Sequence, residues 1–325
     1  MKNVIDKIFN NHKGILAADE SIPTIEKRLK SVGITSTPDA RHSYRHTIFA
    51  SPDLEKHIGG VILYDETIKN PNTIKPLKDK DIVLGIKVDA GTKPYFDGGK
   101  TTEGLDGLTT RLQEYKKLGA QFAKWRAVIS VEDTNKCIRN NAWSLARYAK
   151  LCQSQDIVPI VEPEVLMEGE HDIYDAAHTT ENVLHNVFNS LYDEDVDLEH
   201  MILKPNMVLH GYSSNQQNDP IETANITLKS FRKTVPAAVG AIAFLSGGQD
   251  DGAALNNLAS LNKEFYLPWI MSFSFGRTMQ NGALKYWSKS DIPAAQAWTY
   301  HRAESCSNAI EFGTDYNYKA LSLYL

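Results

Sequence analysis

The 325-residue sequence predicts an α/β fold of the (β/α)8 TIM-barrel type. Eight short apolar runs recur along the chain, and their starts lie 23 to 45 residues apart, which leaves room for a strand, a loop and a crossover helix each time. The segments between these runs carry apolar residues at helical spacing. Strands that are apolar throughout and alternate with helices indicate a parallel sheet buried on both faces. Eight such units in one chain favour a closed barrel.

The first strand is expected in the run GILAAD and the last in PWIMSFSF. The eight predicted strands cover residues 14–19, 59–64, 82–89, 121–129, 157–165, 201–208, 237–245 and 268–275. Helices are expected between them, because Leu108, Leu112, Tyr115 and Leu118 are spaced by 4, 3 and 3 residues. The segments that begin at residue 142 and after residue 178 repeat this pattern, which places one apolar stripe on each helix.

A doubly wound open sheet is the structural alternative. It is disfavoured because Glu20-Ser21-Ile22-Pro23, and not a glycine-rich dinucleotide-binding turn, follows the first strand. No linker or compositional break appears, so we expect one domain over residues 1–325 with a short C-terminal tail from about residue 313.

Composition excludes several classes of protein. Hydrophobic residues make up 42% and charged residues 23% of the chain, and the net charge is −5 without a long run of one sign, which argues against a nucleic-acid partner. The N-terminus lacks the apolar stretch of a signal peptide, and the longest nearly apolar run, 235–245, is far short of the ~20 residues of a membrane span. The three cysteines show no CxxC spacing and favour a reducing compartment. We therefore expect a soluble, cytoplasmic protein without a membrane partner.

Ionisable residues stand near the C-terminal ends of five predicted strands. They are Asp19 on the first, Lys87 and Asp89 on the third, Lys124 and Arg126 on the fourth, Glu162 and Glu164 on the fifth, and Lys204, followed by Asn206, on the sixth. A single charge of this kind usually marks a strand end. Five strands with the same feature indicate instead a cluster at the catalytic end of a barrel. Buried charges there must compensate one another or serve chemistry.

Lysines beside carboxylates suit Schiff-base chemistry. An amine attacks a carbonyl only when unprotonated, and at a pKa of about 10.4 roughly one lysine in a few thousand is ready at neutral pH. Neighbouring cations in a poorly solvated site would lower that pKa, and carboxylates would move the protons of imine formation and carbon–carbon cleavage. Spacing alone leaves the nucleophile open among Lys87, Lys124 and Lys204.

The last two strands end in small residues that expose backbone N–H groups, as phosphate sites of this fold do. These residues are Ser246, Gly247 and Gly248 after the seventh strand, and Ser274, Gly276 and Arg277 at the end of the eighth. A second anion site is possible after the first strand, where Ser21 and Thr24 precede Lys27 and Arg28. Helix capping by Ser21 or Thr24 is the alternative there. No HxH, HExxH or Cys/His cluster suggests a metal, and no cofactor is expected.

With these residues in place, the chain resembles class I fructose-bisphosphate aldolases from about residue 14 to residue 302. The matching segments include GILAADES, GIKVDAGTKP, AKWRAVI, VPIVEPEVLMEGEHDI, LKPNMVLHG, FLSGGQ and SFSFGR. The resemblance implies reversible, metal-independent cleavage of fructose 1,6-bisphosphate to dihydroxyacetone phosphate and glyceraldehyde 3-phosphate, with Lys204 as the Schiff-base nucleophile. It further implies that Glu162 shuttles protons and that Asp19 acts at the C4 hydroxyl.

The remaining site residues are also matched to roles by the resemblance. Lys124 and Arg126 match the cationic pair beside the imine, and Glu164 supports them. One phosphate is assigned to Ser246, Gly247, Gly248, Ser274, Gly276 and Arg277, and the other end of the substrate to Ser21, Thr24, Arg28 and Lys87. The family is typically tetrameric, so a homotetramer is implied. Animal members end in a catalytic tyrosine, whereas the tyrosine here, Tyr324, is penultimate.

Two other functions are compatible with parts of the pattern. A transaldolase, or another Schiff-base lyase built on a barrel, would share the lysine and carboxylates but would not need a second phosphate site. A binding or scaffold protein on a decayed barrel is disfavoured, because decay would remove charges that are costly to bury.

Overall fold

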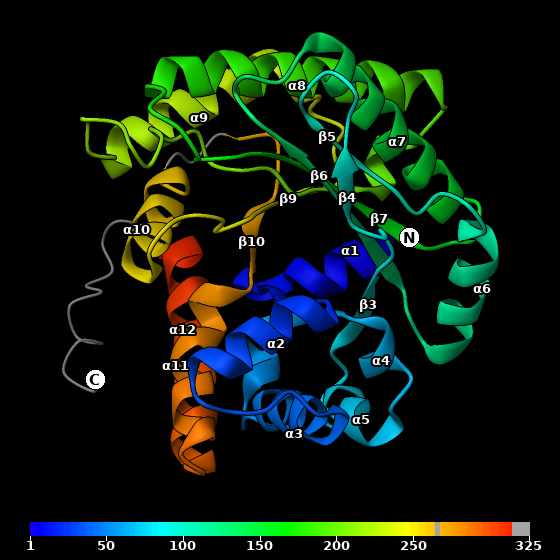
Figure 1. Cartoon of the computed structure of the whole chain (residues 1–325), viewed down its shortest axis with the longest axis vertical. Helices are drawn as coiled ribbons and strands as arrows, with labels where there is room; N and C mark the ends of the chain where they lie inside the picture. Colours follow the sequence, from blue (N-terminus) through cyan, green and yellow to red (C-terminus); the bar gives the residue numbers. More distant parts are fainter. Residues whose placement is uncertain (264–266, 314–325) are drawn as a thin grey trace.

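The computed structural model describes residues 1–263 and 267–313 and contains a closed barrel of eight parallel strands (Figure 1). The strand order around the barrel is β1-β10-β9-β8-β7-β6-β3-β2. Each strand overlaps one of the eight predicted apolar runs, so the predicted (β/α)8 fold is confirmed. The barrel strands are β1 Gly14–Ala18, β2 Ile58–Leu63, β3 Val83–Lys87, β6 Phe122–Ile129, β7 Val158–Val165, β8 Ile202–Leu203, β9 Ala241–Phe244 and β10 Met271–Phe275.

Helices surround the strands (Figure 1). Those described are α1 Lys2–Phe9, α2 Ile22–Ser31, α3 Pro38–Phe49, α4 Asp65–Ile68, α5 Pro71–Asp79, α6 Leu108–Leu118, α7 Asn135–Gln153, α8 Ile173–Asp193, α9 Pro220–Thr234, α10 Asp251–Leu261, α11 Arg277–Ser288 and α12 Ile292–Glu311. Three short 3-10 helices, 10–12, 54–56 and 198–200, complete the described helices. The sequence did not predict one feature, an antiparallel hairpin of β4 Thr92–Pro94 and β5 Lys100–Thr102 that is inserted after β3.

The barrel interior changes character along its axis. Side chains two apart in a strand share a face, and the inward rows begin with buried apolar residues such as Ile15, Phe122 and Ile160. Further along the same rows stand the ionisable residues, for example Lys124 after Phe122 and Glu162 after Ile160. The outward faces of the strands pack against the helices in a second and larger core. The barrel is thus apolar at the N-terminal end of its strands and charged at the other end.

Helix α1 closes the N-terminal end of the barrel. Its buried residues Ile5, Ile8 and Phe9 belong to the same apolar cluster as the inward side chains of the strands. The backbone of β2 approaches this helix so closely that a Cβ built on Gly59 would lie 2.0 Å from the carbonyl oxygen of Ile8. A residue without a side chain is therefore required at position 59 if α1 is to remain in place.

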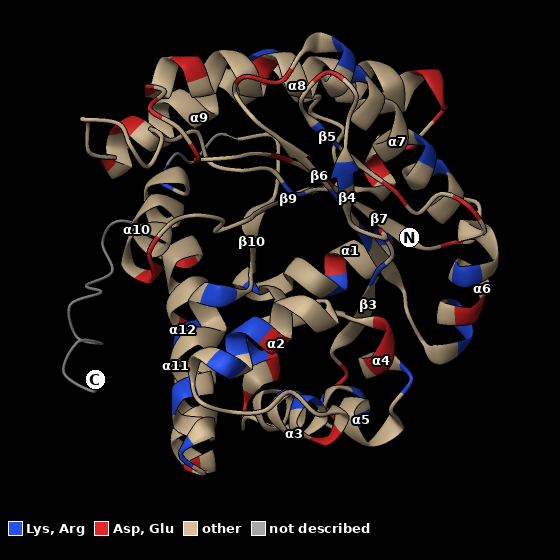
Figure 2. Cartoon of the chain, viewed as in Figure 1, with Lys and Arg blue, Asp and Glu red and all other residues tan. Residues whose placement is uncertain are grey.

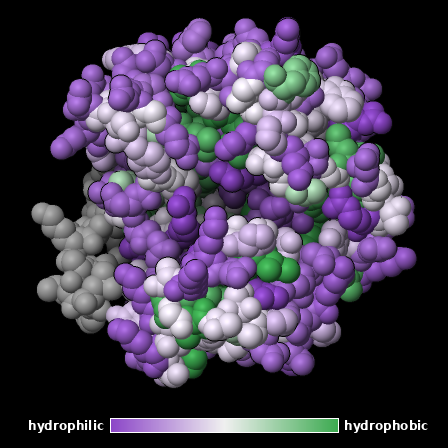
Figure 3. All heavy atoms as spheres, in the orientation of Figure 1, coloured by the Kyte–Doolittle hydropathy of each residue, from purple (hydrophilic) through white to green (hydrophobic). Residues whose placement is uncertain are grey.

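The outer surface fits an amphipathic helical layer. Lysine and arginine are interspersed with aspartate and glutamate over the outer helices (Figure 2), and the surface in this view is largely hydrophilic (Figure 3). The predicted stripe of the longest helix is confirmed, since Val183, Leu184, Val187, Phe188 and Leu191 of α8 are buried. Across residues 1–263 and 267–313, no helix combines the length and the apolar character that a membrane span requires.

Replacement of Gly59 by alanine tests how tightly α1 closes the barrel. The added methyl group meets backbone atoms that cannot rotate away, so we expect the free energy of unfolding to fall by about 1–3 kcal/mol, the usual cost of overpacking. Urea denaturation followed by circular dichroism measures this. Gly252→Ala on α10 is the control, because the nearest atom to its added Cβ lies 3.4 Å away and alanine favours a helix. Equal stability of the two variants would contradict the close packing of α1.

Candidate active site

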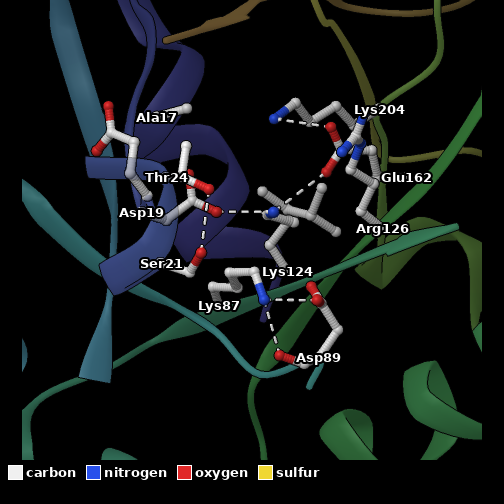
Figure 4. Close-up of polar contacts among 12 residues, drawn as sticks. Ala17, Asp19, Ser21, Thr24, Lys87, Asp89, Lys124, Arg126, Glu162 and Lys204 are labelled. Carbon is white, nitrogen blue, oxygen red and sulfur yellow. Dashed lines mark hydrogen bonds and ion pairs between the residues drawn. The ribbon is translucent and has the colours of Figure 1, made fainter. Parts of the chain in front are cut away.

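Four side chains of alternating charge form a line at the C-terminal end of the barrel (Figure 4). The ammonium Nζ of Lys124 lies 2.7 Å from Oδ2 of Asp19 and 3.5 Å from Oε2 of Glu162. On its other side, Glu162 places Oε1 at 3.2 Å from Nζ of Lys204. Lys124, Glu162 and Lys204 are each 4% exposed, so the line is almost entirely removed from solvent.

Strand geometry explains why these four residues meet. Asp19 directly follows β1, Lys124 lies within β6, Glu162 within β7, and Lys204 directly follows β8. Strands β6, β7 and β8 are consecutive neighbours, whereas β1 lies on the opposite side of the ring. Because the inward side chains of a small barrel fill its interior, the line spans the barrel from β8 to β1. Side chains from opposite walls thus come into contact.

Two further ion pairs flank the line. Lys87 donates to the carboxylate of Asp89 at 2.5 Å and to its backbone carbonyl at 2.8 Å. Nε of Arg126 pairs with Oε2 of Glu164. The eight groups together comprise four cations and four carboxylates, with each cation next to a carboxylate. Compensation of this kind offsets the several kcal/mol that burying a charge costs for the buried members, whereas the Arg126 side chain is 41% exposed.

The ion pairs change the protonation behaviour of the site. Burial alone would raise the pKa of Asp19, but the ammonium groups of Lys124 and Lys204 outweigh it and lower that pKa. Burial alone would likewise lower the pKa of Lys124, but Asp19 and Glu162 outweigh it and raise that pKa above its ordinary value. The expectation that crowding by cations lowers a lysine pKa is therefore wrong for Lys124, because its nearest neighbours are carboxylates. Lys124 stays an ammonium ion at neutral pH.

Each carboxylate oxygen of Glu162 faces one lysine. Oε1 lies 3.2 Å from Nζ of Lys204, whereas Oε2 lies 3.5 Å from Nζ of Lys124, is buried and accepts no hydrogen bond from the described residues. A buried carboxylate oxygen without a hydrogen-bond donor is costly. Oε2 is thus available to take a proton from a reacting group between the two lysines.

The loop of residues 246–248 follows β9 and packs against the same cluster. A Cβ built on Gly247 would lie 2.4 Å from Oε1 of Glu164, so this glycine lets the loop backbone approach the carboxylate. Ser246 is buried. Because β9 pairs with β10, this loop lies next to the end of β10. The small residues thus have a packing role beyond that of an ordinary turn.

The end of β10 contributes the other half of the predicted phosphate site. Ser274 is 1% exposed, and its hydroxyl has no hydrogen-bond partner among the described residues. Gly276 connects the strand to α11, and Arg277 is the first residue of that helix. Arg277 is exposed and shows no ion pair within residues 1–263 and 267–313. A free guanidinium at a helix N-terminus is suited to hold an anion.

Helix α2 carries the predicted second anion site. Ser21 occupies the N-cap position, but its side chain makes no capping hydrogen bond and lies 3.1 Å from the hydroxyl of Thr24. The capping alternative is therefore wrong for Ser21. Arg28 pairs instead with the carboxylate of Glu20, and burial opposed by this carboxylate leaves the pKa of Arg28 raised. Ser21, Thr24 and Lys87 all lie beside the charged line in Figure 4.

Two acidic residues of the site, Glu20 and Asp89, were not predicted to have a role. Asp89 stood in the predicted strand but was given no function, although it binds Lys87. Glu20 pairs with Arg28. Its position directly after Asp19 in the sequence could have indicated that it lies at the site. Asn206 has a structural role, because its Oδ1 accepts from the backbone N–H of Val165. Strand β8 ends at Leu203, so Asn206 lies beyond the strand in which it was predicted.

Replacement of Lys124 by methionine would leave two buried carboxylates without their shared cation. We expect the free energy of unfolding at pH 7 to fall by about 3–5 kcal/mol, as when one partner of a buried pair is removed. The pKa of Asp19 is lowered on folding, so its pair stabilises the protein above the ordinary carboxyl pKa of 3.8, and the loss should shrink as pH falls further. The pKa of Lys124 is raised, so the loss should persist up to its ordinary value of 10.5.

Urea denaturation at pH 7, 4 and 3 measures the effect of this substitution. Lys69→Met is the matched control, because Lys69 forms an exposed pair with Asp65 at 2.6 Å, and such pairs contribute below about 1 kcal/mol. A loss at Lys124 no larger than at Lys69 would show that the charged line adds nothing to stability.

Comparisons with known proteins agree with this geometry. The family model of glycolytic class I fructose-bisphosphate aldolase matches residues 1–320. A probable class 1 fructose-bisphosphate aldolase of Xylella fastidiosa (strain 9a5c) is 47% identical over 305 residues, covering 90% of this chain and 91% of the relative. The fructose-bisphosphate aldolase of Drosophila melanogaster is 45% identical over 325 residues, covering 96% of this chain and 90% of the relative.

The fold agrees with a solved structure as well. The aldolase of Plasmodium falciparum, crystallised with TRAP and a small-molecule inhibitor, superimposes with a TM-score of 0.94. That alignment is 40% identical and covers 96% of this chain and 94% of the Plasmodium chain. Barrel, charged strand ends and relatives lead to one assignment: the chain belongs to the class I fructose-bisphosphate aldolase family.

Proposed function

We propose that the enzyme cleaves fructose 1,6-bisphosphate reversibly into dihydroxyacetone phosphate and glyceraldehyde 3-phosphate through an imine on Lys204. The observation that carries the proposal is the contact of 3.2 Å between Nζ of Lys204 and Oε1 of Glu162, in a carboxylate whose other oxygen has no hydrogen bond within the described chain. This pair combines a nucleophile with a base at hydrogen-bond reach, as nucleophilic catalysis requires.

The surroundings of the three candidate lysines support Lys204 as the nucleophile. Lys87 is engaged by the side chain and the carbonyl of Asp89. Lys124 lies between Asp19 and Glu162, which raise its pKa and keep it protonated. Lys204 contacts one carboxylate, which it shares with Lys124. Its only ion pair among the described residues is thus one that it shares with another lysine.

The proposed reaction begins when the Lys204 amine adds to the C2 carbonyl of the sugar. Glu162 returns a proton to the resulting hydroxyl, which leaves as water and gives a protonated imine. Asp19 then takes the proton of the C4 hydroxyl, the C3–C4 bond breaks and its electron pair moves into the imine. Glyceraldehyde 3-phosphate departs, the enamine regains a proton at C3, and water hydrolyses the imine to release dihydroxyacetone phosphate.

Lys124 and Arg126 would favour these steps electrostatically. The permanent cation on Lys124 stabilises negative charge that develops on oxygen in a site with little solvent. Arg126 is held by Glu164, which in turn borders the 246–248 loop. Neither residue needs a metal partner for these roles, and the imine serves as the electron sink, so the proposed chemistry uses no cofactor.

The phosphate assignments follow the same geometry. Backbone N–H groups of Ser246, Gly247 and Gly248, with Ser274, Gly276 and Arg277, would hold one phosphate. Ser21, Thr24, Arg28 and Lys87 would hold the other end of the substrate. The end of β10, which precedes Arg277, and the end of β1, which precedes Ser21, belong to neighbouring strands, since β10 pairs with β1.

Three further expectations belong to the proposal. The chain would form one domain over residues 1–325, assemble as a homotetramer and work in the cytoplasm. The tail predicted from about residue 313 lies almost entirely within residues 314–325, outside the described part of the chain. Tyr324, the penultimate tyrosine, lies there too. Analytical ultracentrifugation of the full-length protein tests the assembly.

Borohydride trapping tests the nucleophile. Dihydroxyacetone phosphate with borohydride should reduce the imine to a stable secondary amine, label one lysine and abolish activity irreversibly. We expect mass spectrometry of the digested protein to place the label on Lys204. Lys204→Ala should neither acquire the label nor cleave substrate, whereas the surface variant Lys69→Met should behave like the parent. Label on Lys124 or Lys87 would refute the residue assignment and leave the mechanism standing.

Substitution of Arg277 by alanine tests the phosphate site. Charge-assisted hydrogen bonds from a guanidinium contribute on the order of 1.5–3 kcal/mol, so kcat/KM for fructose 1,6-bisphosphate should fall roughly ten- to a hundredfold. Arg277 is exposed, so the fold should persist. For a substrate that lacks the contacted phosphate, Arg277→Ala should lower kcat/KM by a smaller factor, because that contact is already absent.

The measurement is a cycle of two enzymes and two substrates. Fructose 1,6-bisphosphate and fructose 1-phosphate are compared in the parent and in Arg277→Ala, and a second set uses a 6-phosphate analogue. Strict additivity in both sets would mean that Arg277 touches neither phosphate.

A further inference from the structure

The barrel closes at a short seam between β1 and β10. The two strands share two register pairs, Ile15 with Ser274 and Leu16 with Phe275. After Phe275 the chain turns at Gly276 into α11, while β1 continues to Ala17 and Ala18. The seam therefore ends before the residue that carries the first carboxylate of the site.

A glutamine side chain completes this seam. Gln280 lies in the first turn of α11, where its backbone N–H donates to the carbonyl of Gly276 at 3.2 Å. Its side-chain Nε2 donates to the carbonyl of Ala17 at 2.8 Å. The amide thus provides a hydrogen bond to β1 at the point where β10 has ended. It fixes α11 against β1, two residues before Asp19.

The other end of the same amide is also occupied. Oε1 of Gln280 accepts from the hydroxyl of Tyr44 at 3.1 Å and from Nη1 of Arg28 at 3.4 Å. Gln280 and Tyr44 are fully buried. A single side chain therefore joins α11, β1, α3 and α2. An amide suits this position because it presents a donor and an acceptor at once, which a carboxylate or an apolar side chain cannot do.

Gln280 also lies between the two arginines assigned to phosphate. Arg28 contacts its Oε1 directly, and Arg277 stands three residues earlier on the same helix, on a neighbouring position of the helix surface. A change in the Gln280 contacts would move α11, and with it Arg277, relative to α2 and Arg28. The placement of the Arg277 backbone relative to Arg28 thus depends in part on this buried amide.

We propose that Gln280 is a positioning residue that fixes the start of α11, which carries Arg277, relative to Arg28 and thereby gives the enzyme its preference for a ligand with two phosphates. The proposal rests on the proposed function only for the assignment of these arginines to phosphate. It differs from a purely structural role, in which a buried amide with three hydrogen bonds would stabilise the fold and leave ligand preference unchanged.

Binding measurements on Gln280→Met separate these roles without relying on catalysis. Methionine keeps the volume of the side chain and removes its hydrogen bonds. By calorimetry we expect the dissociation constant for hexitol 1,6-bisphosphate to rise about tenfold, and that for hexitol 1-phosphate to rise less than about threefold. With fructose 1,6-bisphosphate as substrate, KM should rise by a similar factor while kcat changes little. An equal effect on both hexitol phosphates, or no effect on either, would overturn the proposal.

Asn141→Leu is the matched control. Asn141 on α7 is a buried amide that likewise forms hydrogen bonds to three residues, Lys100, Cys137 and Thr102, far along the chain from Arg28 and Arg277. Both substitutions should lower the melting temperature, but Asn141→Leu should leave the ratio of the two dissociation constants at the parent value. A comparable shift of that ratio in Asn141→Leu would assign the effect to general loosening of the fold and refute a specific role for Gln280.

A milder variant and a double-mutant cycle complete the test. Tyr44→Phe removes one donor to Oε1 with little change in volume, so it should shift the ratio in the same direction by about two- to threefold even if Gln280→Met folds poorly. Arg28→Lys keeps a positive charge beside Glu20 but lacks the planar fork. If Gln280 acts through Arg28, then Gln280→Met should raise the dissociation constant for hexitol 1,6-bisphosphate by a smaller factor in Arg28→Lys than in the parent. Equal factors in the two backgrounds would contradict the proposal.

These outcomes remain distinguishable from failure of the proposed function. A parent enzyme that binds hexitol 1,6-bisphosphate but is not trapped by borohydride at Lys204 would refute the imine mechanism and leave the positioning test intact. A parent that is trapped at Lys204, together with an unchanged ratio in Gln280→Met, would refute the positioning role alone.

Discussion

Glu162 lies between two lysines inside the barrel, and the remaining charges of the site follow from how that carboxylate is compensated. A single buried carboxylate would be neutralised or excluded, because taking a charge out of water costs several kcal/mol. Here Lys124 and Lys204 share Glu162, and Asp19 in turn compensates Lys124. The result is a line in which each charged side chain is compensated by a neighbour of opposite charge. Removing any member would leave its neighbours uncompensated, so stability and reactivity are coupled in the same four side chains.

The sequence was sufficient to predict the barrel and the gathering of charges, but not how the charges pair. Apolar runs at regular spacing determine where strands lie, and the strand period determines that Phe122, Lys124 and Arg126 share a face. The partner of each charge depends on contacts across the ring, and β1 and β6 are far apart in strand order. For this reason the predicted direction of the pKa shift was wrong at Lys124, because that direction depends on whether the nearest neighbours are cations or carboxylates. The β4–β5 hairpin and the closure by α1 also carry no strong periodic signal.

Neutral residues were the hardest to predict. Gly247 is explained by its approach to Glu164, and Gln280 by hydrogen bonds to three other elements, and neither relation is visible in a local pattern. Ionisable residues stand out in the barrel strands because such strands are otherwise apolar throughout. A glutamine is an ordinary residue of an amphipathic helix and does not stand out. Residues that position a site are therefore recognised only after the fold has brought their partners together.

The closure of the barrel floor by α1 has a consequence for the order of events in the proposed reaction. Ile5, Ile8 and Phe9 fill the N-terminal end together with the apolar inward residues of the strands, so a substrate would reach Lys204 from the C-terminal end. The water that hydrolyses the imine would then enter from the end at which the first product leaves. While glyceraldehyde 3-phosphate occupies that end of the barrel, water would be kept from the imine that forms when the enamine is protonated, and an incoming aldehyde in the reverse reaction would compete with water for the same space. In a barrel that is closed at one end, glyceraldehyde 3-phosphate would therefore have to leave before dihydroxyacetone phosphate is released.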